Sequence, residues 1–184
     1  MHRRVVLSLA FIGLHQACGG EAGNDPGDID VAVAALGTGP ERTADPSFQP
    51  RFDPIAPGEA ILLGTGGQGA VYHAPVALRV TDRPLSDFPN PVRIRGEGRR
   101  NSDGLLVARV STFSRLMQDE DGLISDTPVQ VLLCPAPIGE TLLDATIDLE
   151  LRLEDDERNV YGRGSMNFSI LCPDELCNEL CAGL

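Results

Sequence analysis

Residues 144–154 read DATIDLELRLE, and this stretch decides the fold class. Apolar residues occupy every second position from Ala145 to Leu153, and polar residues fill the positions between them. In a β-strand, successive side chains point to opposite faces, so this period of two predicts a strand with one buried and one solvated face. Half-solvated strands of this kind are typical of antiparallel sheets.

The same alternation recurs on both sides of this stretch, between clusters of Gly, Pro and Asp. No segment sustains the period of an amphipathic helix. The further strand candidates are residues 60–63, 72–80, 92–95, 106–110, 129–133 and 166–170. About seven short strands predict an all-β fold, namely an antiparallel immunoglobulin-like β-sandwich, with a small β-barrel as the alternative.

The N-terminus has the pattern of an export signal. Met1 to Arg4 is a short basic start, Val5 to Leu14 is almost wholly apolar, and the small residue Ala17 precedes Cys18. The apolar run is well short of the ~20 residues that a membrane-spanning helix needs. We therefore interpret residues 1–17 as a signal peptide.

These residues resemble a bacterial lipoprotein precursor. Leu14, Ala17, Cys18 and Gly19 match the family pattern, and His15 departs from it because the family prefers an aliphatic residue there. The resemblance implies cleavage before Cys18, attachment of lipid to its thiol and anchoring in a membrane. Glycine rather than aspartate after the cysteine implies the outer membrane. We expect an exported protein that is lipid-anchored in the bacterial cell envelope.

A change in composition divides the mature chain. Residues 19–51 are rich in Gly, Pro, Asp and Ala, and their sole apolar patch, Val31 to Leu36, is too short to fold alone. We expect residues 18–51 to form the lipidated cysteine and a flexible acidic linker. Residues 52–184 would then form the β-sandwich domain, with a cysteine-rich C-terminus.

Cysteine parity supports the lipidation of Cys18. Five cysteines in an exported chain leave one without a disulfide partner, and a lipid on Cys18 accounts for that one. For the other four, disulfides are expected rather than a zinc site, because the envelope is oxidising. These four are Cys134, Cys172, Cys177 and Cys181.

The disulfide pairing depends on where two strands end. Cys134 and Cys172 each end an apolar strand and precede a proline, which favours a Cys134–Cys172 bridge, with Cys177–Cys181 in a short helical turn. Bridged Cα atoms lie within about 7 Å, so the two strands must converge. If they do not, Cys134 pairs with Cys177 or Cys181.

The charge balance excludes one class of partner. The chain has no lysine and a net charge of −12, which becomes −14 once residues 1–17 are removed. Nucleic-acid binding rests on neutralising phosphates, so we expect no nucleic-acid partner. The chain has no Trp and only two Tyr, which argues against a carbohydrate platform and an aromatic-rich interface.

Residues 64–69, GTGGQG, match the G-x-G-x-x-G pattern of dinucleotide-binding loops. That motif needs a following helix, whereas a strand pattern containing Pro75 follows here. We therefore expect a turn between two strands and no nucleotide cofactor. The segment from Gly67 to His73 resembles the opening strand of certain uncharacterised exported bacterial domains, a likeness that carries no activity.

Catalytic and metal-binding patterns are sparse. His73 is the single histidine of the mature chain and alternates onto a polar face, so we expect its imidazole to be solvated or locally hydrogen-bonded. Ser165 lacks the final glycine of a G-x-S-x-G elbow and falls within a strand pattern. Two acidic loops provide the calcium candidates, for which solvated turns are the preferred interpretation. The candidates are Asp119, Asp121, Asp155 and Asp156.

These patterns predict a non-catalytic binding or interaction module without a cofactor. Its partners would be the membrane, through the lipid on Cys18, and an unidentified envelope protein. One alternative is a structural accessory subunit of an envelope complex. Another is a metal-dependent hydrolase that uses the loop carboxylates.

Overall fold

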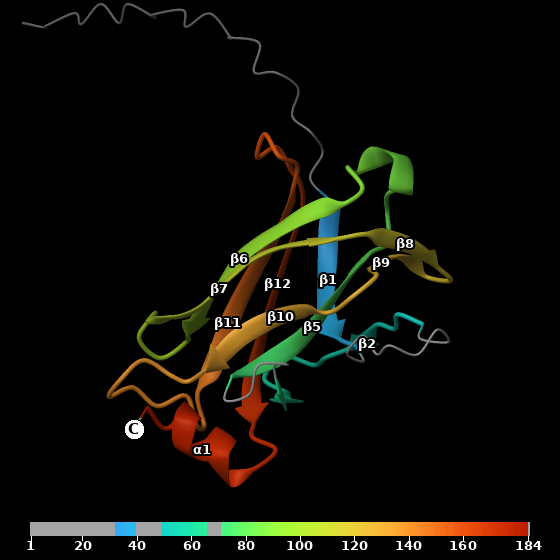
Figure 1. Ribbon diagram of the computed structural model, residues 1–184. Helices are drawn as coiled ribbons and strands as arrows, with labels where there is room; N and C mark the ends of the chain where they lie inside the picture. Colours follow the sequence, from blue (N-terminus) through green and yellow to red (C-terminus); the bar gives the residue numbers. More distant parts are fainter. Residues whose placement is uncertain (1–31, 40–48, 66–70, 184) are drawn as a thin grey trace, which may run out of the picture.

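The computed structural model describes residues 32–39, 49–65 and 71–183. Strands dominate these ranges, beside one 3-10 turn and one short α-helix, so the all-β prediction is confirmed (Figure 1). The predicted signal peptide and Cys18 lie outside the described residues. Within them, no helix is long and apolar enough to cross a bilayer.

The elements follow one another in chain order. They are β1 (Ala32–Thr38), β2 (Asp53–Pro54), β3 (Ala60–Leu62), β4 (Gly64–Thr65), β5 (Tyr72–Val80), η1 (Leu85–Asp87), β6 (Val92–Arg100), β7 (Leu106–Ser114), β8 (Leu116–Asp119), β9 (Gly122–Ser125), β10 (Val129–Cys134), β11 (Thr146–Glu154), β12 (Val160–Leu171) and α1 (Glu175–Cys181).

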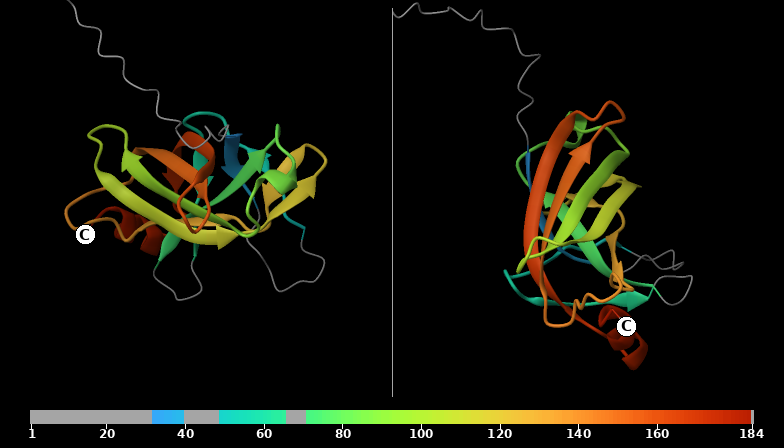
Figure 2. Two further views of the ribbon diagram at one scale, coloured as in Figure 1. Left: turned by 90° about the horizontal axis from the view of Figure 1, so that it is seen from above. Right: turned by 90° about the vertical axis from the view of Figure 1, so that its left-hand side faces the viewer.

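The described strands form one curled sheet with the order β7-β6-β11-β12-β1-β5-β9-β8, and the four remaining strands pair beside this path. β12 is parallel to both β1 and β3, so the sheet is mixed. It curls into a half-barrel, as both views of Figure 2 show. The expected seven-stranded antiparallel sandwich is not confirmed, because hydrogen bonds connect the strands continuously.

β1 corrects the predicted domain boundary. Residues 32–38 were expected within the flexible linker, but they pair with β5 along 34–38 and with β12 at Ala32 and Val33. Their alternating burial hides Ala32, Ala34 and Leu36. A patch too short to fold alone is thus a strand in the middle of the sheet, because strands from distant parts of the chain flank it.

The core lies inside the curl. The alternation of residues 146–154 is confirmed, with Ile147, Leu149 and Leu153 at most 2% exposed. Leu151 faces Gly96 on β6 and Gly164 on β12. A Cβ at Gly96 would meet the carbonyl oxygen of Glu150 and lie 2.5 Å from the Leu151 side chain. Glycine at this position therefore leaves room for that side chain.

β5 is buried on both faces, which corrects the prediction for His73. The imidazole is fully buried rather than solvated. On the same face of β5, Ala77 packs with Phe52 and Ile124 in a second small apolar cluster. Arg79 closes this cluster, with its guanidinium 4.7 Å from the centre of the Phe52 ring. A strand covered on both sides does not keep the solvated face that its alternation suggested.

The C-terminal cysteines form two disulfides, but not the favoured pairs. Cys134 bonds to Cys181 and Cys172 bonds to Cys177. The expected Cys134–Cys172 bridge fails because β5 and β1 separate β10 from β12 in the sheet. α1 instead turns back to β10 and brings Cys181 to the end of that strand. The alternative pairing of Cys134 with Cys181 is the one observed.

Candidate anion-binding face

The outward face of β6, β11 and β12 carries arginines at matching positions. Arg95 on β6 lies opposite Arg152 on β11, and Arg152 lies opposite Arg163 on β12. We call these three residues the arginine row. Ser111 on β7 and Val33 on β1 continue the row at its two ends. The row reaches the outer face because the alternate positions of each strand face the core.

The charges of the arginine row are only partly neutralised. The Nε of Arg95 lies 3.8 Å from the carboxylate of Glu154, which is almost fully buried. Arg152 and Arg163 are exposed and form no ion pair with any described residue. Like charges directly opposite each other destabilise a sheet. Two arginines without ion pairs at directly opposite positions are therefore an unfavourable arrangement that an anionic ligand would relieve.

Acidic residues occupy the next row of the same face. Glu97 on β6 lies opposite Glu150 on β11 and opposite Arg109 on β7. Arg99 donates to Glu97 over 2.7 Å, and the Nε of Arg109 lies 3.9 Å from the same carboxylate. Glu150 has no ion pair within the described ranges. The face thus presents a cationic row beside an acidic one.

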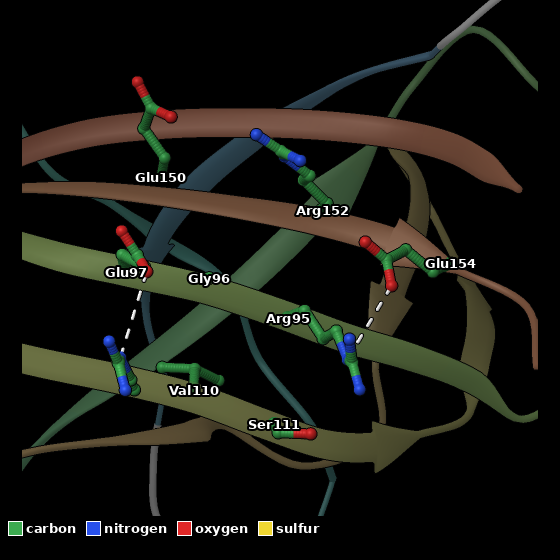
Figure 3. Close-up of a pocket in the computed structure, with 9 residues that line it drawn as sticks. Arg95, Gly96, Glu97, Val110, Ser111, Glu150, Arg152 and Glu154 are labelled. Atoms are coloured by element: carbon green, nitrogen blue, oxygen red, sulfur yellow. Dashed lines mark ion pairs between the residues drawn. The ribbon is translucent and has the colours of Figure 1, made fainter. Parts of the chain in front are cut away.

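Two grooves flank the middle of the arginine row. The first, of about 460 Å³, lies over β6, β7 and β11. Figure 3 shows that Glu150 and Arg152 project from β11 to the same side of the sheet as Arg95. Three arginines and three glutamates line this groove, so their charges balance. Arg95 pairs with Glu154 and Arg109 with Glu97, whereas Arg152 and Glu150 form no ion pair with a described residue.

The second groove, of about 470 Å³, lies over β11, β12 and β1. Arg152 and Arg163 line it with Glu150 as the only acid, so the lining is net cationic. Its β1 side is apolar, with Val33 78% exposed. Ser165 adds a hydroxyl. The second groove therefore combines two unpaired guanidiniums with an apolar wall.

This lining is suited to binding an anion. A guanidinium presents a planar fork of N–H donors that matches the two oxygens of a carboxylate or the oxygens of a phosphate. The residues that line the second groove include no histidine, cysteine or aspartate. They provide donors for an anion and an apolar surface for whatever carries it.

No family model matches this chain, and no curated protein matches it.

The calcium candidates are engaged in contacts within the protein. Asp119 and Asp121, at the turn between β8 and β9, lie 2.6 Å and 3.2 Å from the guanidinium of Arg79. Asp156, after β11, lies 3.2 Å from Arg93. The Asp119 pKa is lowered by hydrogen bonds from the Glu120 backbone N–H and from Arg79.

Asp155 closes the turn that was predicted between the last two strands. Its carboxylate accepts from the Asn159 side chain at 2.7 Å and from the Tyr161 hydroxyl at 3.1 Å. The hydrogen bond from the Asn159 side chain is the largest cause that lowers the Asp155 pKa. Burial is the largest cause that raises the Tyr161 pKa, followed by the hydrogen bond that the Tyr161 hydroxyl donates to Asp155. Among the described residues, only three cysteines are grouped closely enough to hold a metal.

Sequence reasoning missed the arginine row. Each arginine appeared as one polar position in an alternating strand, and only the pairing register aligns the three. The alternation of residues 92–95 indicated that their arginines share one face of a strand, but it did not indicate which strands lie beside that face. Ser165, considered as a nucleophile, lies within β12 as predicted and lines the second groove. Residues 66–70 lie outside the described ranges, although β4 and β5 on either side are antiparallel strands, as the turn prediction required.

Proposed function

We propose that this protein is a non-catalytic binding module that holds an anionic group, a carboxylate or a phosphate, on Arg152 and Arg163. The observation that carries the proposal is the cross-strand pairing of these two arginines without an ion pair in the described part of the chain. The chain is acidic overall, so this local positive charge lies within the negative electrostatic field of the whole protein. An anion between the two guanidiniums would remove their mutual repulsion.

The proposal includes the place of action. We propose that residues 1–17 are removed on export, that Cys18 carries lipid, and that the domain acts in the bacterial envelope, with an envelope protein among its partners. The N-terminal pattern supports this. Two disulfides in a small domain also agree with an oxidising compartment.

The arginine Nε–Hε resonances test the ligand site. The mature domain, produced without lipid, is titrated with inorganic phosphate and separately with succinate, and the shifts are followed by NMR. We expect the Arg152 and Arg163 resonances to shift and saturate together. Charge-assisted hydrogen bonds from two arginines are lost in an Arg152→Gln/Arg163→Gln variant, so its affinity should fall at least about ten-fold.

Arg115→Gln is the matched control, because Arg115 is exposed, lies outside the arginine row and has no ion pair with a described residue. Its affinity should equal that of the wild type. Equal shifts at Arg115, Arg152 and Arg163, with no loss in the double variant, would show diffuse screening of charge and would refute the site. A response to only one probe distinguishes phosphate from carboxylate.

The anchor is tested separately. In a bacterial host, the wild-type chain should incorporate labelled fatty acid and partition into a detergent phase. A Cys18→Ser chain should do neither, because the thiol that accepts the lipid is gone. Equal partitioning of the two chains would contradict the anchor and leave the arginine site unaffected.

A further inference from the structure

Four cysteine sulfurs converge where α1 meets the end of β10. Besides the two bonded pairs, the Sγ of Cys181 lies 3.6 Å from that of Cys172 and 3.7 Å from that of Cys177. The sulfurs of Cys172, Cys177 and Cys181 all lie within 4.8 Å of one another. The two disulfides therefore touch. A thiolate released on Cys177 from the Cys172–Cys177 bridge would therefore lie beside the Cys181 sulfur of the Cys134–Cys181 bridge.

The four cysteines differ in their exposure to solvent. Cys177 and Cys181 are fully buried, and Cys134 is 2% exposed. Cys172 alone is partly exposed. Thiol–disulfide exchange needs a thiolate to reach a sulfur directly. An external thiolate can therefore reach this cluster only at Cys172.

We propose that this cluster is a disulfide-exchange site that accepts a low-molecular-weight thiol at Cys172 and passes the exchange inward. In the first step the external thiolate bonds to the Cys172 sulfur. The Cys172–Cys177 bond breaks, and its electron pair stays on Cys177 as a thiolate. In the second step that thiolate bonds to Cys181, the Cys134–Cys181 bond breaks, and Cys134 leaves as a thiolate that takes a proton from water. One external thiolate is consumed and one free thiol, that of Cys134, is formed in the protein, with no net oxidation.

The product bridge requires a local change in α1. Cys177 and Cys181 are four residues apart in this helix, which places their Cα atoms about 6 Å apart, within the range of disulfides, but their Cβ atoms about 5–6 Å apart. Because bridged Cβ atoms lie about 4 Å apart, the last turn of α1 must tighten when the bridge forms. The second step removes the covalent link between β10 and α1. Backbone hydrogen bonds remain, from Ala136 to Leu180 and from Leu142 to Cys181. These bonds keep the end of α1 next to residues 136–142 after exchange.

The second step also traps the product. The Cys177 thiolate is the group that would expel the external thiol from Cys172. Once Cys177 is bonded to Cys181, reversal requires Cys134 to attack first. The cluster should therefore hold its adduct more persistently than one exposed disulfide does.

The test uses the full chain with Cys18→Ser, so that four cysteines remain. The protein is incubated with reduced glutathione at mildly alkaline pH and quenched with acid. Free thiols are then alkylated and the peptides are mapped by mass spectrometry. We expect glutathione on Cys172, the alkyl label on Cys134 and a new Cys177–Cys181 bridge. Alkyl label on Cys177 with an intact Cys134–Cys181 bridge would overturn the inward step, and glutathione on any buried cysteine would overturn the attack at Cys172.

A Cys134→Ser/Cys181→Ser variant tests the trapping. It retains the Cys172–Cys177 bridge but has no second disulfide for the Cys177 thiolate to attack. That thiolate therefore expels glutathione from Cys172 again. Its steady adduct should be at least about ten-fold lower than that of the parent. Equal adduct in both proteins would contradict the relay. Circular dichroism shows whether the variant is folded. In an unfolded variant the Cys172–Cys177 bridge would open freely, and the peptide map of the parent protein then decides the proposal by itself.

Discussion

Arg100 joins three parts of the chain at the end of β6. Its guanidinium contacts the carboxylate of Asp103 in the following turn and that of Glu140 at 2.6 Å. It also donates to the Thr141 carbonyl oxygen at 3.0 Å. The Arg100 side chain is only 14% exposed. The hydrogen bond from Arg100, followed by that from the Leu105 backbone N–H, lowers the pKa of Asp103 to about 2.

This lowered pKa makes the free energy of unfolding depend on pH in the acid range. The folded-state value of about 2 lies below the ~3.9 of an unfolded chain, so the contribution is present above about pH 4 and is lost as pH falls towards about 2. Urea unfolding across this window should show a falling free energy of unfolding. The fall should be shallower in Asp103→Asn.

Asp82→Asn is the control, because Asp82 is exposed and has no ion pair with a described residue. Its pH profile should run parallel to that of the wild type. An Asp103→Asn profile that also runs parallel would show that the carboxylate contributes nothing specific.

At the scale of elements, β1 is held by the backbone of β12. A Cβ at Gly164 would collide with the Ala34 carbonyl oxygen and would lie 2.9 Å from the Leu36 side chain. Gly164→Ala should therefore push β1 away from β12 and lower the free energy of unfolding by about 1–3 kcal/mol. Hydrogen exchange at the amides of 34–38 should accelerate.

Gly98→Ala is the matched control within the same sheet. Its added Cβ would lie 3.1 Å from the Ala108 side chain and would meet no backbone atom closer than 3.9 Å. We expect a cost of under about 1 kcal/mol and unchanged exchange in β1. Equal effects of the two substitutions would contradict the close approach of β1 and β12.

Sequence pattern located the strands that carry their own alternation. β5 has the bounds that the pattern gave, and β11 differs only at its start. β1 was missed because its pairing partners lie far along the chain and its flanks are rich in Gly and Pro. β8 and β9 were missed because each has four residues beside an acidic turn. The arginine row is hidden in the same way, since register is a property of pairs of strands.

At the scale of the whole molecule, the two disulfides constrain loops of unequal length. Cys134 and Cys181 are 47 residues apart, whereas Cys172 and Cys177 are five apart. From loop-closure entropy, Cys134→Ser/Cys181→Ser should lose about 4 kcal/mol of stability and Cys172→Ser/Cys177→Ser about 2 kcal/mol. Urea unfolding of both variants measures the difference. Equal losses, or the reverse order, would contradict the pairing observed.

The central position of β1 has a consequence for the order of folding. A ribosome makes β1 first among the described strands and β12 last, yet the two are neighbours in the sheet. Loop closure over so long a separation is slow, because the entropy is lost before the contact forms. A nascent chain that has not yet reached residue 160 has β1 bonded along one edge at most. The sheet is therefore completed only after β12 itself has been made, and truncations before β12 should be degraded rather than accumulate as a smaller stable domain.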